Sequence, residues 1–504
     1  MTDLAENTTH DRTTEWHRLD IRIVVAYLST LLAPAAGVAA TMAFTGGNVS
    51  REGLVWLGLL CLGFLCLAGY GLLKYRTTRY CITDERVELR SAAMFRRDRV
   101  VRRDRIRTVD VSANPLYRVL GITVVKIGTG QQSSSGSSAE LAIDGVPKAL
   151  ALQLRHRLQY GDSTSDTEVP ATGALATLQW AWLRFAPLSL LGMGGVVAAL
   201  GVAYQILEKL GIEPWELDAL RGLGDWLAAQ PLWVSVGLLV AVTVVLATLA
   251  TLLSFVESWW RFRLERQGEH LRVQSGLLTT RSFSVAYDRL QGIEIAEPML
   301  LRGGGGARTK ALVAGLRDSE GEGQQPRNDL LPPAPRAEAE RVVAAVLAPL
   351  PTDLTAHPRA ALSRRRFRAL TTVTVLVGAT ALTGLWWTDV LYWVAAGGAL
   401  VLYPLGWAMA ASAYRNLGHG VSGDHVVVRS GVFVRRTRVI RRASIIGWNL
   451  SQTPMQRRVG LATLTATLAS GDGTCPVIDI ALADVPRFAQ QVVPGLLTPF
   501  VDES

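Results

Sequence analysis

The chain has 504 residues, a net charge of +10 and a mean hydropathy of +0.23. This length suits several domains, and the positive hydropathy is typical of membrane spans separated by globular parts rather than of a soluble protein. The four cysteines show neither metal-ligand spacing nor a disulfide framework, and a basic chain with apolar segments favours an anionic membrane surface over nucleic acid.

Six apolar stretches are each long enough to cross a bilayer, which takes roughly 20 residues. In chain order they are 21–44, 54–73, 183–207, 232–256, 370–387 and 390–413. They occur in pairs, so we expect three transmembrane helical hairpins. The second link, 208–230, is the longest and places Trp215, Leu220, Leu223 and Trp226 among acidic residues. This link predicts either an amphipathic helix at the membrane interface or a simple polar loop.

Lysine and arginine gather at the outer ends of the predicted hairpins. They are Arg18, Arg22, Lys74, Arg76, Arg79, Arg261, Arg263, Arg364, Arg365, Arg366, Arg368 and Arg415. The links inside the hairpins carry few basic residues. Because cytoplasmic flanks are enriched in lysine and arginine, we expect a multi-pass plasma-membrane protein with both termini and all globular parts in the cytoplasm.

One pattern recurs after each pair of spans. A turn serine is followed, at almost constant spacing, by a proline; the serines are Ser91, Ser275 and Ser430, and the prolines are Pro115, Pro298 and Pro454. Between them the apolar residues alternate with a period of two, which predicts strands. Segments 146–158, 336–347 and 485–496 predict a closing helix in each case. The chain is therefore a threefold repeat of one unit, and we call its globular parts repeats 1, 2 and 3.

The predicted fold is six membrane helices plus three cytoplasmic α+β domains, each an antiparallel β-roll or barrel with a C-terminal helix. The predicted boundaries are a cytoplasmic tail at 1–20, hairpin 1 at 21–73, domain 1 at 74–160, a linker at 161–182, hairpin 2 at 183–256, domain 2 at 257–350, a basic juxtamembrane linker at 351–369, hairpin 3 at 370–413 and domain 3 at 414–504.

Repeat 2 departs from the pattern. Residues 303–306 are four glycines, and 318–335 is an acidic and proline-rich stretch that predicts a disordered loop. A phosphate-binding loop needs Gly-Lys-Ser/Thr opening a helix, and Lys310 is misplaced for that role. The glycines are therefore interpreted as a flexible link between strands.

The chain resembles the bacterial pleckstrin-homology-like (PH-like) membrane proteins of the YdbS/YdbT type. The resemblance rests on the strand opening at 82–87, the Arg-Ser turn, the Pro-Leu/Met step and the two spans before each domain. It implies a PH-like barrel with a C-terminal helix in each repeat, and a smaller one-domain relative as a partner. It implies no settled activity.

Clustered arginines are the candidate contact residues for anionic lipid or a partner. They are Arg97, Arg99, Arg103 and Arg105 in repeat 1, and Arg435, Arg436, Arg441 and Arg442 in repeat 3. In a strand of period two such residues form basic faces, each worth about 1 kcal/mol near an anionic surface. The alternative is that they are ordinary cytoplasmic flanking charges on solvated strands.

The sequence contains no catalytic constellation, metal-ligand cluster or nucleotide motif, so we expect no enzymatic activity and no cofactor. The predicted function is an integral membrane scaffold that presents three PH-like domains at the cytoplasmic face, in envelope maintenance or in stress and antimicrobial tolerance. Its expected partners are the lipid bilayer, anionic phospholipid head groups and a smaller PH-like protein. The alternative is an exporter or transport-accessory subunit for a peptide or lipid.

Overall fold

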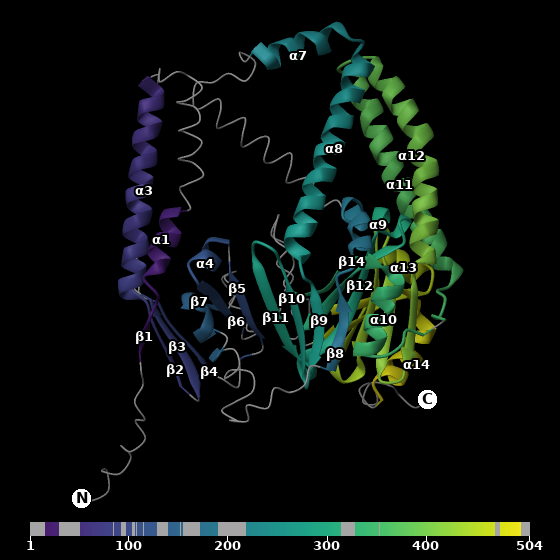
Figure 1. Ribbon diagram of the computed structural model, residues 1–504. Coiled ribbons are helices and arrows are strands. Elements are labelled where there is room, and N and C mark those ends of the chain that lie inside the picture. Colours follow the sequence, from purple (N-terminus) through teal and green to yellow (C-terminus); the bar gives the residue numbers. More distant parts are fainter. Residues whose placement is uncertain are drawn as a thin grey trace, which may run out of the picture. The chain divides into compact units, whose positions relative to one another are not determined.

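The computed structural model describes residues 16–29, 51–83, 85–91, 97–102, 106, 108–113, 115–128, 140–151, 153–154, 172–189, 218–313, 328–351, 353–468 and 474–494 (Figure 1). The chain divides into two compact units, which we call the N-terminal unit (residues 1–286) and the C-terminal unit (287–504). The division falls inside repeat 2, between its fourth and fifth strands.

Three described helices are long and apolar enough to cross a membrane. They are α8 (Leu232–Trp259), α11 (Arg359–Gly384) and α12 (Val390–Arg415), which cover the fourth, fifth and sixth predicted spans. Helices α11 and α12 pack as a hairpin, with Thr374 Oγ1 and Tyr403 OH at 2.8 Å. Most of their large apolar side chains are exposed, as expected for surfaces that face lipid.

Helix α3 (Arg51–Thr77) covers the whole of the second predicted span, whereas the first and third are covered only in part. Helix α1 (Arg22–Ser29) lies in the first, and residues 30–50 fall outside the described part. The start predicted for the third span is wrong, because Trp180–Phe185 (η2) and Pro187–Ser189 (η3) form 3₁₀ turns. Trp182 and Phe185 are buried, and both turns contact α8. Six crossings therefore stay a prediction.

The link in hairpin 2 contains a helix, α7 (Asp218–Ala229). The loop is therefore wrong over these residues and a helix is confirmed, whereas a position at the membrane interface stays a prediction. Residues 208–217, including Trp215, lie outside the described part.

Repeat 1 consists of two half-sheets. The first holds β1 (His17–Arg18), β2 (Arg79–Ile82), β3 (Arg86–Ser91) and β4 (Arg97–Arg102), in that order. The second holds β5 (Thr108–Ala113), β6 (Ile122–Gly128) and β7 (Glu140–Pro147). Buried residues of both half-sheets and of α1 form one core, which includes Ile23, Val87, Ile127 and Ile143.

The second half-sheet of repeat 1 continues into repeat 2. Strands β8 (Thr172–Thr177), β9 (Arg263–Gln267), β10 (His270–Ser275) and β11 (Thr280–Ala286) join it in a seven-stranded sheet of order β7-β6-β5-β11-β10-β9-β8. The antiparallel pair of β5 and β11, which we call junction 1, makes this sheet continuous between the two repeats.

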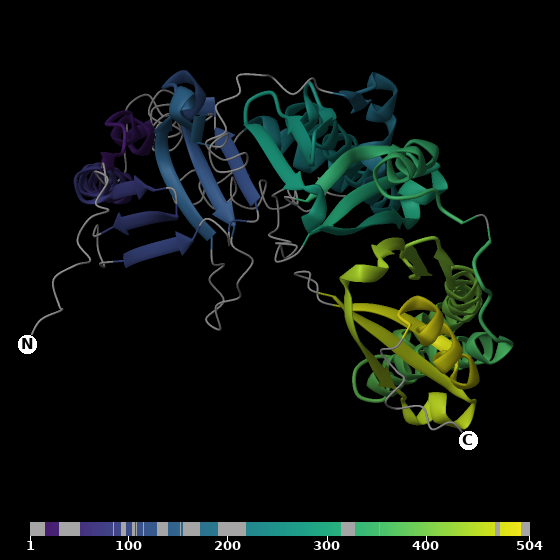
Figure 2. The same cartoon turned by 90° about the horizontal axis from the view of Figure 1, so that it is seen from below.

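The C-terminal unit repeats this arrangement. Strands β12 (Leu290–Pro298), β13 (Gly306–Val313) and β14 (Asp329–Pro335) join β15 (Gly418–Ser422), β16 (His425–Ser430) and β17 (Val434–Arg441) in a six-stranded sheet. Its order is β14-β13-β12-β17-β16-β15. Figure 2 shows the elements of each unit from below. The antiparallel pair of β12 and β17 is junction 2.

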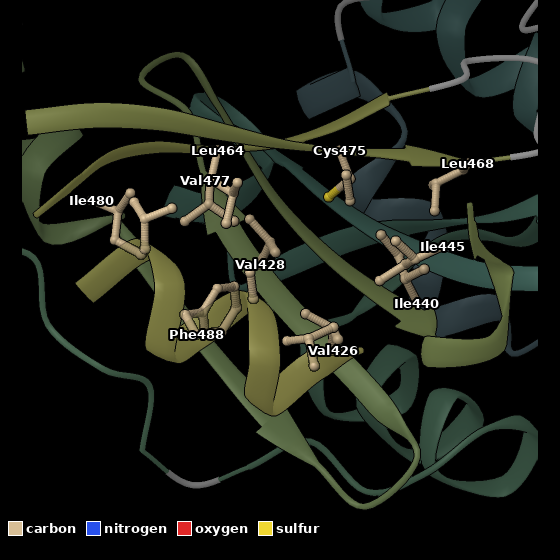
Figure 3. Close-up of a cluster of buried hydrophobic side chains, with 14 of the residues drawn as sticks. Val426, Val428, Ile440, Ile445, Leu464, Leu468, Cys475, Val477, Ile480 and Phe488 are labelled. Carbon is tan, nitrogen blue, oxygen red and sulfur yellow. The ribbon is translucent and has the colours of Figure 1, made fainter. Parts of the chain in front are cut away.

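Repeat 3 ends in a three-stranded sheet and a helix. Strands β18 (Ile445–Ser451), β19 (Leu461–Leu468) and β20 (Thr474–Ala481) are followed by α14 (Val485–Val492). Figure 3 shows Phe488 of α14 lying against Val428 of β16, among side chains from β17 to β20. Each end repeat thus keeps its own core, while neighbouring repeats share sheets. A prediction of three separate rolls missed this sharing.

The two junctions have the same register. Thr108 pairs with Val285 at junction 1, and Gly292 pairs with Ile440 at junction 2. Counted from the turn serines Ser91, Ser275 and Ser430, these two pairs occupy corresponding positions. The junctions are therefore two occurrences of one interface.

The prolines of the repeat also keep one structural place. They start or precede the short helices α4 (Pro115–Val119), α9 (Met299–Gly303) and α13 (Pro454–Arg458). The disordered loop predicted at 318–335 is wrong for 329–335, because these residues form the buried strand β14. β14 lies at a sheet edge, where proline removes no ladder bond. Residues 314–327 lie outside the described part.

Candidate functional site: matched cavities at the two junctions

A cavity of about 460 Å³ opens at junction 1. Its walls come from β5 and β6 of repeat 1, from β10 and β11 of repeat 2 and from the residues just after α8. Five basic residues line it: Arg118, Lys148, Arg261, Arg272 and Arg281. The described lining contains no carboxylate. Because the lining is rich in basic side chains, the cavity suits an anionic group.

This basic cavity lies next to the end of a candidate membrane helix. Trp260 and Arg261, both in the lining, directly follow α8. The β10–β11 turn is bonded to the same helix end, since Gly276 N donates to Trp260 O at 2.9 Å and Leu277 N donates to Glu257 O at 2.8 Å. Tryptophan and arginine at the end of a span are typical of the head-group level. The cavity is therefore placed where lipid head groups would lie if α8 crosses the bilayer.

The turn that holds this arrangement requires glycine. Gly276 has φ of 113°, and a Cβ there would lie 1.9 Å from Thr279 O. Gly431 occupies the same place in repeat 3, with φ of 119° and 1.8 Å to Val434 O. Asn416, which ends α12, donates to Gly431 O at 3.1 Å. The same turn therefore joins strand and membrane helix in both repeats.

A second cavity, of about 490 Å³, lies at the corresponding place in junction 2. Ile295, Val427 and Thr437 line it, and they correspond by repeat position to Val111, Arg272 and Ser282 in the basic cavity. Here the lining includes three carboxylates, Glu297, Glu340 and Asp353, beside two arginines, Arg336 and Arg429. The two cavities have a common origin in the fold but different charge.

Ion pairs neutralise the second cavity and its junction. Arg435 of β17 donates to both carboxylate oxygens of Glu297 of β12, at 2.6 and 2.5 Å. Arg438 donates to Glu294, the residue opposite it in the ladder, at 2.6 Å. Glu294 and Glu297 are buried. Bidentate pairs of this kind fix register as well as charge.

Comparison with family models finds the bacterial PH domain three times, at residues 24–161, 219–350 and 367–492. These matches cover well over half of the sequence. The chain belongs to the bacterial PH domain family. The three matches begin in the first predicted span, in the link of hairpin 2 and in the basic juxtamembrane linker. No curated protein and no solved structure matches the chain. The family resemblance is confirmed, and the YdbS/YdbT type stays a prediction.

In the third bacterial PH domain the predicted contact arginines have partners inside the protein. Arg435 binds Glu297, and Arg436 Nε lies 3.7 Å from Glu294. Arg441 donates to Tyr287 O at 2.8 Å, with its guanidinium over the Tyr287 ring. Arg442 donates to Val492 O and Gln491 O at the end of α14. These side chains link neighbouring repeats or cap the C-terminal end of α14. Lipid contact by them stays a prediction.

In the first bacterial PH domain, Arg97 and Arg99 lie on β4. Arg103 and Arg105 lie outside the described residues. Among the predicted residues of repeat 1, the structure therefore places two on one strand. None of the eight predicted arginines lines the basic cavity.

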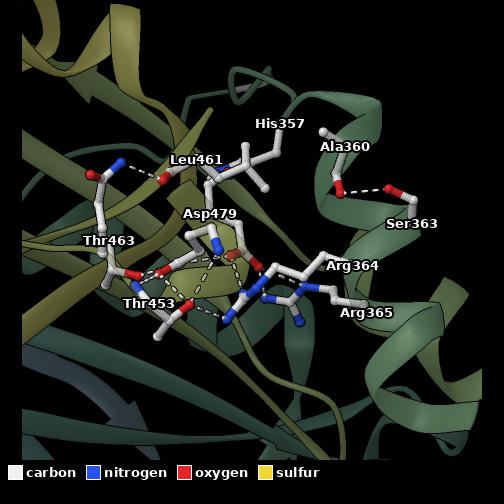
Figure 4. Close-up of polar contacts among 11 residues, drawn as sticks. His357, Ala360, Ser363, Arg364, Arg365, Thr453, Leu461, Thr463 and Asp479 are labelled. Carbon is white, nitrogen blue, oxygen red and sulfur yellow. Dashed lines mark hydrogen bonds and ion pairs between the residues drawn. The ribbon is translucent and has the colours of Figure 1, made fainter. Parts of the chain in front are cut away.

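Basic residues at the helix ends anchor the helices to the domains. Arg364 and Arg365 of α11 both pair with the buried Asp479 of β20, the latter at 3.2 Å, and Gln456 Nε2 donates to the same carboxylate at 3.0 Å. Figure 4 shows both arginines pointing at Asp479. In the N-terminal unit, Lys74 of α3 pairs with Asp144 of β7 at 2.5 Å. Arg364, Arg365 and Lys74, from which the topology was predicted, therefore form ion pairs between the helices and the domains.

A histidine pair lies beside this anchor. His357 Nδ1 is 2.9 Å from Asp479 O, and its Nε2 is 3.1 Å from His419 Nδ1. Both are buried. Burial, with the neighbouring His357, lowers the pKa of His419 to about 4, and burial also lowers the pKa of His357. Among the described residues no group of three or more His, Cys, Asp or Glu is placed to hold a metal ion.

Sequence reasoning missed the basic cavity because its residues are far apart in the chain. Arg118 and Lys148 come from repeat 1, whereas Arg272 and Arg281 come from repeat 2. Only the pairing of β5 with β11 brings them together. One signal was present in the sequence. Arg272 is basic, whereas its counterpart in repeat 3 is the uncharged Val427; Arg281 and its counterpart Arg436 are both basic.

Proposed function

We propose that this protein is a non-enzymatic membrane scaffold that presents PH-like domains at the cytoplasmic face. The observation that carries the proposal is the sharing of sheets between repeats at both junctions. Within each unit, the strand ladder holds parts of two neighbouring repeats in a fixed position, which suits the presentation of binding surfaces. PH domains are in general interaction modules rather than catalysts.

Membrane attachment and orientation are part of the proposal. The three apolar helices α8, α11 and α12 support attachment, and the basic residues at their domain-side ends support a cytoplasmic location for the domains and termini. The ties of Arg364 and Arg365 to Asp479 support a fixed position of repeat 3 against its helix. A role in envelope maintenance or stress tolerance, with a smaller PH-like partner, is the process we propose for it.

We assign the basic cavity of junction 1 to an anionic lipid head group. Its charge, its volume and its place next to the end of α8 support this choice. Each basic residue near an anionic surface contributes about 1 kcal/mol. The corresponding cavity of junction 2 is not assigned a ligand, because its carboxylates offset its arginines.

The test measures binding of short-chain phosphatidylglycerol and phosphatidylcholine to the full chain in neutral detergent at low salt. We expect preference for phosphatidylglycerol, and Lys148→Gln with Arg281→Gln should weaken it about 30-fold, which corresponds to about 2 kcal/mol. The matched control, Arg457→Gln with Arg458→Gln, removes the same charge from exposed positions on α13 and should change binding less than threefold. Equal binding of the two lipids by the unaltered protein would refute the assignment.

A further inference from the structure

Two strands lack the neighbour that their counterparts have. Strand β4 corresponds to β11 and β17, and β18 corresponds to β5 and β12. The four counterparts are paired with one another at junctions 1 and 2. In the described part of the chain, β4 and β18 are each the last strand of their sheet.

The other sheet edges do not show this asymmetry. Strands β7, β14 and β20 correspond to one another in the three repeats, and each lies at the edge of its sheet. At the opposite side, β1 and β8 are edges in repeats 1 and 2, and the bridge between Thr355 and His419 holds that place in repeat 3. The repeat therefore singles out β4 and β18 as the halves of a third junction.

Apolar side chains are exposed along both edges. Leu450 of β18 is 50% exposed, whereas its counterpart Ile295 at junction 2 is 2% exposed. Val100 of β4 is 57% exposed, whereas its counterpart Val439 is 1% exposed. Exposed apolar edge strands are templates for pairing with another chain. The surface that each junction buries is thus present and uncovered here.

The space for a neighbouring strand is also open. A Cβ added at Gly292 of β12 would lie 2.3 Å from Val439 O, because β17 packs there. Gly447 is its counterpart on β18, and nothing described lies within 4 Å of a Cβ built there. The position of β17 at junction 2 has no occupant beside β18.

We propose that β18 of one molecule pairs with β4 of a second molecule of this chain, antiparallel and in the register of junctions 1 and 2. That register places Gly447 opposite Val101, Asn449 opposite Arg99 and Ser451 opposite Arg97. These pairs correspond to Gly292–Ile440, Glu294–Arg438 and Ala296–Arg436.

A second molecule is the occupant because one chain carries both complementary edges. Trp448 opposite Val100 matches Ile293 opposite Val439 in apolar character. Asn449 stands where junction 2 has Glu294, so the contact between molecules lacks the buried ion pair and is weaker than junction 2. A head-to-tail contact of this kind continues into closed rings or open chains.

The test uses two differently tagged full-length forms expressed together in membranes. One carries Ser451→Cys and the other Arg97→Cys, with the exposed Cys61 and Cys66 replaced by serine. A short thiol crosslinker should join the two tags. Leu450→Cys with Arg97→Cys is the control; its side chains lie on opposite faces of the proposed sheet, and it should give at least tenfold less product.

The second readout is the fraction of oligomer in detergent. It is measured for variants that change the charge of the Asn449–Arg99 pair. Asn449→Glu restores the carboxylate found at junction 2 and should strengthen assembly about tenfold. Asn449→Lys should weaken it by a similar factor, and Arg99→Glu combined with Asn449→Lys should restore it. Crosslinking at equal yield in both registers, a monomer at every concentration, or capture only of a smaller PH-like protein would overturn the proposal.

Discussion

Junction 1 and junction 2 join the same pair of strands in the same register, but they differ in charge. At junction 2, buried Glu294 and Glu297 bind arginines of the next repeat. At junction 1, five basic residues line the corresponding cavity without a carboxylate. Duplication thus supplied one backbone interface twice. The side chains then gave one junction buried ion pairs and the other a cavity whose lining is basic and holds no carboxylate.

The largest expected difference between the two junctions is the loss of stability when one partner of a buried ion pair is removed. Glu297→Ala leaves Arg435 without its carboxylate, so we expect about 3–5 kcal/mol loss of stability in the C-terminal unit. At junction 1, Lys148→Ala should cost under about 1 kcal/mol, because Lys148 is an exposed residue of the cavity lining. Hydrogen exchange of β12 and β17, compared with β5 and β11, measures both changes. Equal effects would show that charge does not distinguish the junctions.

Acidification should weaken the C-terminal unit. His419 has a folded pKa of about 4, below the ordinary value of 6.5, so the unfolded state binds more protons between these values. Stability is therefore full above pH 6.5, falls as pH drops toward 4, and loses about 3 kcal/mol at most. Thermal unfolding of the full chain from pH 7 to pH 4 measures it. His419→Gln should flatten the profile, and an unchanged slope would contradict the role of His419.

The turn glycines should be equally costly to replace, because both junctions share the turn. Gly276→Ala and Gly431→Ala each force a Cβ against a carbonyl oxygen, at 1.9 and 1.8 Å. We expect about 1–3 kcal/mol at each site. Thermal unfolding of the two variants provides the comparison, with Gly303→Ala, which has open space, as the control. A cost at only one site would mean that the turns are not equivalent.

Changing the charge of the second cavity should make it resemble the first. Glu340→Gln with Asp353→Asn removes two of the three carboxylates that line it. We expect new affinity for phosphatidylglycerol of about 1–2 kcal/mol, which is roughly tenfold. The control pair Glu338→Gln with Asp484→Asn lies outside the lining and should leave binding unchanged. No gain in the cavity variant would show that charge alone does not decide lipid binding.

Much of the fold could be predicted from local patterns. Period-two segments gave the strands, and Pro115, Pro298 and Pro454 marked one position in each repeat. Residues 329–335 were missed because three prolines and a charged flank resemble a loop, whereas their burial at a sheet edge depends on tertiary packing. The 3₁₀ turns at Trp180–Phe185 were missed because a segment with buried tryptophan and phenylalanine has the same apolar composition as a segment that faces lipid.

The candidate site was beyond sequence reasoning for a different reason. Arginines that are adjacent in sequence, such as Arg435 and Arg436, were expected to act together on a surface. The structure assigns Arg435 to a carboxylate in the preceding repeat instead. The basic cavity arises from residues of two repeats, so only the pairing between repeats reveals it.

The most direct test of the shared sheets is crosslinking at one ladder position in each junction. Arg281→Cys with Ser112→Cys and Arg436→Cys with Ala296→Cys are corresponding pairs in the two ladders. With Cys61 and Cys66 replaced by serine, each pair in a single chain should crosslink within the molecule. Ala113→Cys with Arg281→Cys places the thiols on opposite faces and should not. Failure of both matched pairs, or equal crosslinking of the mismatched one, would contradict the shared-sheet architecture.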